Sequence, residues 1–253
     1  MPVRSLLVGR ARAVAVAVAC AAVVVMALAT GCEMRVEVAV DVESGGSGSV
    51  AVGVGFDDAA VERLGDPAEA LALDDLVAVG WLLEPIERND DGITWVRVTR
   101  SFDDPAGFSA VLDEVAGAGG PLTGSSLSVE RGLVNTTTRL VGVVDLSAGL
   151  APFADADLTA ATGGVPFAGL IAEVEAAERR PVADMVPVSV SWTVGADSAV
   201  VTPRLGDPPV VVDLTQQDRP LQWMVLPAVA LAVVAGVALT VAVVQRRRKH
   251  PIA

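Results

Sequence analysis

The stretch MRVEVAVDV, from Met34 to Val42, decides the fold of this chain, because aliphatic side chains occupy every second position. Such alternation predicts a strand with one apolar and one polar face. The turn-forming run SGGSG, Ser44 to Gly48, follows, and VAVGVGF, Val50 to Phe56, then alternates apolar with small residues. We therefore predict a hairpin whose valine face packs against the core.

Working outward from this hairpin, the sequence predicts more strand pairs and several helices. Further strands are expected over 82–89 with 93–102, 127–131 with 134–146, 186–194 and 210–212. Helices are expected after Asp57-Asp58, from Asp66-Pro67, from Asp104-Pro105 to Gly119-Gly120, and from Phe167 to Val174. The fold class that follows is α+β, a mostly antiparallel sheet of hairpins with helices on one face. Phe56 to Ala59 and Phe102 to Pro105 both place a phenylalanine at a strand end before two aspartates that can cap a helix. Two explanations remain open: a duplicated ββα unit, or the residues that strand-to-helix turns commonly contain.

The first 31 residues have the composition of a secretory signal. Arg4, Arg10 and Arg12 precede an apolar run, which LATGC, Leu28 to Cys32, closes with small residues before a cysteine. The Gly31-Cys32 junction resembles a bacterial lipobox. We therefore expect residues 1–31 to be a lipoprotein signal peptide and Cys32 to be lipidated. The alternative is an ordinary signal cleaved near Ala29, with Cys32 unmodified.

The other end of the chain predicts one C-terminal transmembrane helix over residues 221–244. Trp223 to Val244 is an apolar run of the length that a span requires, about 20 residues. The basic run Arg246 to Lys249 follows at once, as the positive-inside rule expects of a cytoplasmic tail, here residues 245–253. We thus expect a single-pass protein of the cell membrane, with residues 32–219 forming an extracytoplasmic domain. A buried soluble helix is the alternative.

The exported part is strongly acidic. It carries 31 acidic residues against eleven arginines, a formal charge of −20, and it has no lysine. This charge excludes nucleic acid as a partner, because phosphate is repelled at long range. His250 of the tail is the sole histidine in the sequence, so no histidine-based catalysis or metal site is expected outside the membrane. We expect no cofactor and no metal.

Paired carboxylates are the remaining candidates for chemistry. They occur as Asp57-Asp58, Asp74-Asp75, Asp90-Asp91, Asp103-Asp104, and Asp155 with Asp157. Most stand where a helix cap, helix surface or turn explains an aspartate locally. The last pair lacks the glycine at position six of a calcium-binding loop. We therefore do not expect an enzyme. A carboxylate-dependent enzyme is kept as a further hypothesis, behind the two binding functions that are stated below.

Bulky aromatic side chains are rare in an otherwise small core of alanine, valine and glycine. The candidates for lining a ligand cavity are Trp81, Trp95, Phe102, Phe108 and Trp192. Strands of valine and glycine under amphipathic helices can leave a hollow interior that suits acyl chains. The alternative is that these aromatics simply fill the core.

The whole layout resembles the LppM-domain family of actinobacterial membrane-anchored lipoproteins. The resemblance rests on Arg35-Val36 after Cys32, on Leu127 to Arg131, on Val143 to Ser147, and on Trp192 in a late strand. It implies a domain that binds envelope glycolipids such as phosphatidylinositol mannosides and acts in host interaction. The chain departs from the pattern in the stretch Ser147 to Pro166 and in its acidity, so no binding residue carries over.

Our first hypothesis is therefore a cell-envelope lipoprotein whose exported domain binds a lipid or glycolipid near the membrane. The second is a protein-interaction module of the bacterial envelope without a small-molecule ligand. A hollow apolar interior would favour the first hypothesis, and an exposed apolar patch or sheet edge would favour the second. Two close, buried and unpaired carboxylates would favour the enzyme.

Overall fold

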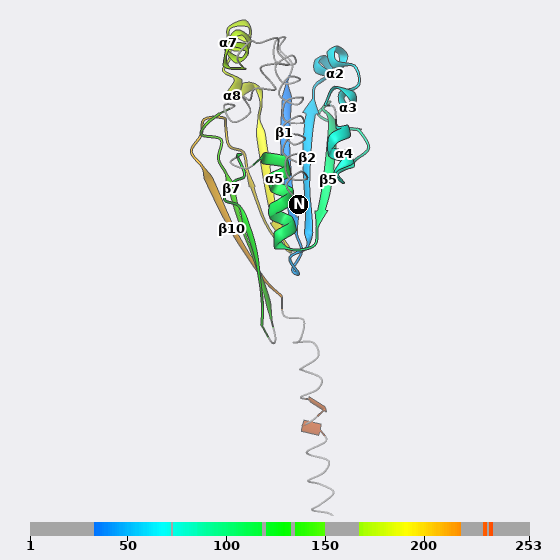
Figure 1. Cartoon of the computed structure of the whole chain (residues 1–253), viewed down its shortest axis with the longest axis vertical. Coiled ribbons are helices and arrows are strands. Elements are labelled where there is room, and N and C mark those ends of the chain that lie inside the picture. The colour runs from blue at the N-terminus through cyan, green and yellow to red at the C-terminus, as the bar shows by residue number, and fades with distance from the viewer. Residues whose placement is uncertain are drawn as a thin grey trace, which may run out of the picture.

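The computed structural model describes residues 33–71, 73–117, 120–132, 135–149, 167–218, and 230, 231, 233 and 234. The strands are β1 (Met34–Val42), β2 (Gly48–Phe56), β3 (Leu82–Leu83), β4 (Glu87–Arg88), β5 (Thr94–Phe102), β6 (Ser126–Arg131), β7 (Thr136–Val144), β8 (Val188–Val194), β9 (Asp197–Val201) and β10 (Val210–Asp218). The helices are α2 (Asp58–Leu64), α3 (Pro67–Ala70), α4 (Asp74–Ala78), α5 (Pro105–Ala116), α7 (Phe167–Glu178) and α8 (Val182–Met185). The fold class is α+β, as predicted (Figure 1).

The larger sheet has the strand order β3-β5-β2-β1-β8-β9, with β4 also paired to β5. The predicted hairpin lies at its centre, with Val40 opposite Val50. On the other side of β1, however, Trp192 of β8 stands opposite Val40 in a parallel ladder. The sheet is therefore mixed. Long crossovers through the rest of the chain make this pairing possible, and periodicity within a strand carries no information about it.

A second sheet corrects the expectation of a single one. It has the order β10-β7-β6 and is antiparallel throughout. It lies against the β8–β9 side of the larger sheet (Figure 1). The contact is close: Trp192 is fully buried, and a Cβ built on Gly142 of β7 would lie 2.5 Å from its Cε2 atom. The bare backbone of Gly142 thus lets the Trp192 indole fill the space between the sheets.

Helix α5 covers the rest of the inner face, where Phe108, Val111 and Leu112 are buried. It begins, as expected, at Asp104, whose side chain accepts the amide of Gly107 at 2.8 Å. It ends at Ala116, ahead of the predicted stop. The helix expected after Asp66 is instead two short ones, α3 and α4. Together with α2 they lie beside one end and one edge of the larger sheet (Figure 1).

The predicted signal and the predicted membrane span lie mostly outside the described residues. Residues 1–32 and most of 221–244, and with them the predicted signal, Cys32 and the predicted span, lie outside the described residues. Among the residues that are described, no helix is both long and apolar enough to cross a membrane. The lipidation and topology of the chain therefore stay predictions.

Replacing Gly142 by alanine should destabilise the domain, because the new Cβ would collide with the buried indole of Trp192. Overpacking of this kind costs about 1–3 kcal/mol. Denaturant unfolding of the full chain, followed by tryptophan fluorescence, measures the loss. Gly45→Ala is the matched control, since nothing lies within 4 Å of a Cβ at that position. Equal stability of the two variants would show that the sheets do not pack through this contact.

Candidate interaction surface

An apolar patch is exposed at the β3 edge of the larger sheet. It is formed by Val77, Leu82, Leu83 and Ile86, whose exposed fractions are 47%, 70%, 44% and 45%. Because successive residues of a strand face opposite sides, Leu82 and Leu83 lie on the two faces of this edge. We call these four residues the edge patch. Burial of side chains this large and this exposed would stabilise a complex.

Beside the edge patch, the outer face of β5 carries a tryptophan covered by an arginine. Trp95 lies across Gly53 and Gly55 of β2, where added Cβ atoms would be 3.2 and 3.0 Å from its ring. The Arg97 guanidinium stacks over this ring, 4.6 Å from its centre. The two glycines thus form a flat floor, and Trp95 is only 8% exposed.

Two glutamates join the edge patch to this stacked pair. Glu84 donates its amide to the carbonyl of Arg97 at 2.9 Å, and its carboxylate accepts the Thr99 hydroxyl. Glu87 lies 4.0 Å from the Arg97 guanidinium, which Glu37 also approaches at 3.4 Å. Leu82 is in register with Thr99 and therefore lies on the same face as the Trp95–Arg97 stack, while Leu83, in register with Val98, lies on the other face.

The other aromatics proposed for a ligand cavity lie in the core. Trp81, Phe102, Phe108 and Trp192 are all buried and belong to one packed cluster. Phe102 and Phe108 meet edge to face, with ring centres 5.4 Å apart. The Trp81 indole donates to Glu114 of α5 at 3.2 Å, and Arg100 pairs with the same carboxylate. Trp95 alone of the five lies outside this cluster, on the opposite face of the sheet.

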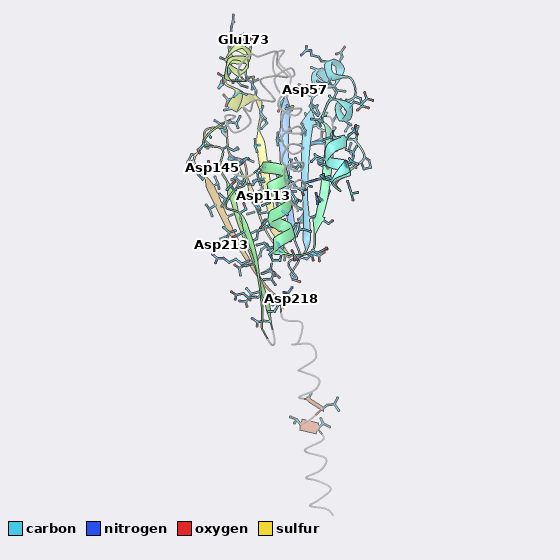
Figure 2. The ribbon with its side chains drawn as sticks, in the orientation of Figure 1. Asp57, Asp113, Asp145, Glu173, Asp213 and Asp218 are labelled. Atoms are coloured by element: carbon cyan, nitrogen blue, oxygen red, sulfur yellow. The ribbon has the colours of Figure 1, made fainter. Side chains whose placement is uncertain are left out.

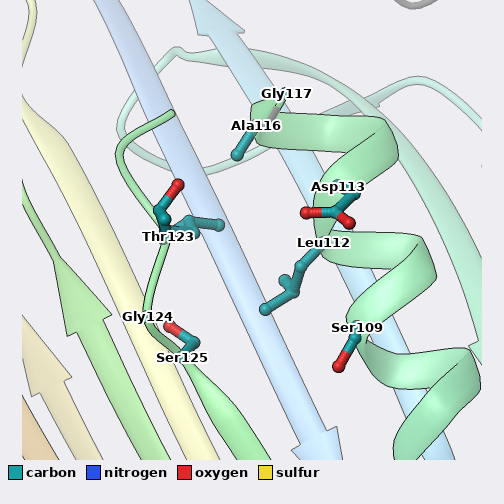
Figure 3. Close-up of a pocket in the computed structure, with 9 residues that line it drawn as sticks. Ser109, Leu112, Asp113, Ala116, Gly117, Thr123, Gly124 and Ser125 are labelled. Atoms are coloured by element: carbon teal, nitrogen blue, oxygen red, sulfur yellow. The ribbon is translucent and has the colours of Figure 1, made fainter. Parts of the chain in front are cut away.

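A small pocket lies between α5 and the residues that lead into β6 (Figure 3). Ser109, Leu112 and Asp113 line it from the helix, and Thr123 and Ser125 face them. Its volume is about 70 Å³. Pockets for ligands of drug size occupy about 300–1,000 Å³. This pocket is therefore too small to enclose an acyl chain.

Asp57, Asp58 and Asp104 of the candidate pairs have local partners, while Asp155 and Asp157 lie outside the described residues. Asp57 caps α2 by accepting the amide of Ala60 at 2.7 Å, and Asp58 pairs with Arg88. Hydrogen bonding from Arg88 lowers the pKa of Asp58, and hydrogen bonding from Arg139 lowers the pKa of Asp213. No cluster of acidic, cysteine or histidine side chains among the described residues could hold a metal ion.

Sequence reasoning missed the edge patch. Residues 82–89 were predicted to form one strand of a hairpin with 93–102. Leu82-Leu83 and Glu87-Arg88 do pair with β5, but the segment between them leaves the regular ladder. Pro85 was the available signal, because proline is confined to edge strands and irregular positions.

Comparisons with known proteins identify no family for this chain and give a weak structural similarity. No family model matches the chain, and no curated protein matches it significantly. Among solved structures, it is similar to the NMR structure of the folded domain of the Mycobacterium tuberculosis LppM protein. That similarity covers 74% of this chain and 90% of the other, at 11% identity and a TM-score of 0.34. Likeness to the LppM domain is thus weak, and membership of that family stays a prediction.

The ion pair between Arg139 and Asp213 predicts how the stability of the domain depends on pH. Arg139 Nε donates to Asp213 at 2.9 Å, which favours the charged carboxylate. Arg139→Gln should therefore raise the Asp213 pKa toward its ordinary value, as followed by NMR titration. In the parent protein the stabilisation from this pair is present above the unfolded-state pKa and is lost as pH falls through the lower folded-state pKa. Arg88→Gln is the control, since it should shift Asp58 and leave Asp213 unchanged.

Proposed function

We propose that this chain is an anchored cell-envelope protein whose exported domain binds another envelope protein through the edge patch. The observation that carries the proposal is the exposure of Leu82, Leu83 and Ile86 beside a closely packed interior. Four of the five aromatics that could have lined a ligand cavity pack into the core instead. Of the two hypotheses for its ligand, the interaction module is the one that these features favour.

The surroundings of the edge patch define the chemistry of this partner. Asp74 is exposed at the start of α4, and the Glu87 side chain is 72% exposed beyond β3. The partner that fits presents an apolar centre to the leucines and basic groups to these carboxylates. Such electrostatic pairing raises the association rate and weakens as salt is added.

Site-specific photocrosslinking in the native envelope tests this proposal. A photoreactive residue at Leu82 should form one dominant adduct with a protein, and Ile86→Asp should abolish that adduct by placing a charge in the apolar contact. The matched control is Val200, which is 65% exposed on the opposite edge of the sheet. The same adduct from both positions would contradict a specific surface. Adducts with lipid alone would favour the other hypothesis.

A glycolipid headgroup is the second candidate, and Trp95 is the observation in its favour. Its ring lies on the outer face of the sheet under the Arg97 guanidinium, rather than in the core. A sugar can stack on this ring once the Arg97 side chain moves off it, and its hydroxyls then bond to the arginine and carboxylate groups. Glu37 and Glu87 already neutralise Arg97, so the pair suits sugar hydroxyls better than a phosphate.

Binding of phosphatidylinositol mannoside micelles measures this second candidate. If Trp95 holds the headgroup, Trp95→Leu should weaken retention of the full chain on these micelles, because the leucine side chain has no aromatic face. Arg139→Gln is the control, since Arg139 lies on β7 of the smaller sheet and bonds Asp213 there. Equal retention of all three proteins would exclude a headgroup site at Trp95.

A further inference from the structure

The two ends of the described domain lie at opposite poles of its long axis. At one pole Glu33 donates its amide to Asp57 at 2.7 Å, and Met34 pairs with Phe56. At the other pole β10 ends at Asp218. Figure 2 shows Asp57 near the top of the domain and Asp218 at its lower end.

Strand register sets the distance between these poles. Gly195 donates its amide to the carbonyl of Val42, the last residue of β1, at 2.9 Å. A Cβ on Gly195 would lie 3.1 Å from the side chain of Gln216, so β10 passes this level two residues before its end. The nine residues of β1 separate the two levels by about 26 Å.

Little chain separates either pole from its predicted anchor. Cys32 directly precedes Glu33, whose amide is bound, and the predicted span starts at Leu221, three residues after Asp218. A residue of extended chain covers at most about 3.6 Å. The residues between each pole and its predicted anchor are therefore too few to span the distance between the two poles.

We infer that the domain lies with its long axis along the membrane and with the β9–β10 side facing lipid. This inference rests on the anchored topology of the proposed function. If lipid at Cys32 and the span at Leu221 enter one membrane, both poles must approach it. An upright domain would hold the Cys32 pole about 26 Å above the lipid.

Charge and strand order select the side that faces the membrane. Residues 57–91, which form α2 to α4 and the β3 edge, carry eleven acidic residues and two arginines. Residues 188–218, which include β8 to β10, carry four acidic residues and one arginine. Anionic lipid headgroups repel the first side more strongly. The β9–β10 side also exposes Val200 and Val211, at 65% and 64%.

This orientation deepens the proposed function by placing the edge patch away from lipid. Five strand spacings separate β3 from β9, about 24 Å. The edge patch then points into the space outside the membrane, where a partner protein can reach it. The same membrane contact that shields Val200 leaves Leu82 free.

Energy transfer from single fluorescent labels to a dye on the vesicle surface tests the inference. The lipidated full chain is reconstituted into vesicles of phosphatidylethanolamine and phosphatidylglycerol, with one new cysteine in each variant. Glu62→Cys marks the Cys32 pole, and Gly45→Cys marks the Asp218 pole, where a Cβ meets no atom within 4 Å. Val200→Cys and Leu82→Cys mark the two edges, at 65% and 70% exposure.

Labels at 62, 45 and 200 should transfer efficiently, and the label at 82 should lose most of that transfer. A chain that starts at Glu33, and so lacks both Cys32 and residues 1–31, should lose transfer from position 62 while position 45 is unchanged, because only the span then holds the domain. Weak transfer from position 62 in the lipidated protein, or stronger transfer from 82 than from 200, would overturn the inference. Release of the full chain by an alkaline wash would instead overturn the anchored topology itself.

Discussion

The packing of the Trp192 indole against the bare backbone of Gly142 is the constraint on which the rest of the structure depends. Trp192 stands at the centre of β8, opposite Val40, so one side chain connects the parallel ladder of the larger sheet with the middle strand of the smaller one. Close packing of this kind tolerates little change in volume. Among the described residues the buried indole nitrogen has no hydrogen-bond partner, and the ring is held by its packing against Gly142.

Most of the aromatics that were candidates for lining a ligand cavity pack into the core of the described domain. Four of the five aromatics that could have lined a cavity instead belong to one packed cluster with the aliphatic side chains of both sheets. The pocket beside α5 is of the order of a few water molecules in size, at about 70 Å³. On the outer surface, the apolar side chains of the edge patch and the acidic residues around them define the chemistry of the proposed partner.

Local periodicity predicted most individual strands but could not predict how they assemble. β1, β2, β6, β7 and β8 follow the predicted ranges closely, because alternation of apolar and polar residues survives in each of them. The predictions were wrong where the sequence pattern is weaker. β9 was not predicted, β10 extends beyond the predicted 210–212 to Asp218, and the helix predicted after Asp66 is two short helices. For the candidate surface, the sequence singled out Asp74 as a carboxylate on a helix surface, but not Glu84 or Glu87. It did not predict that Leu82 and Leu83 are exposed, since a leucine in a short strand is buried or exposed according to its neighbours.

By itself the sequence determined the α+β class, the central hairpin, the helix caps at Asp57, Asp66 and Asp104, and the acidity of residues 32–219. Each of these follows from residues close together in the chain, where alternation, capping and charge act locally. Only the tertiary structure decided that β8 pairs in parallel with β1, that β6, β7 and β10 form a sheet of their own, and that Glu33 and Asp218 lie at opposite poles. Those features depend on contacts between distant segments, whose free energy comes from side chains that fit together in three dimensions.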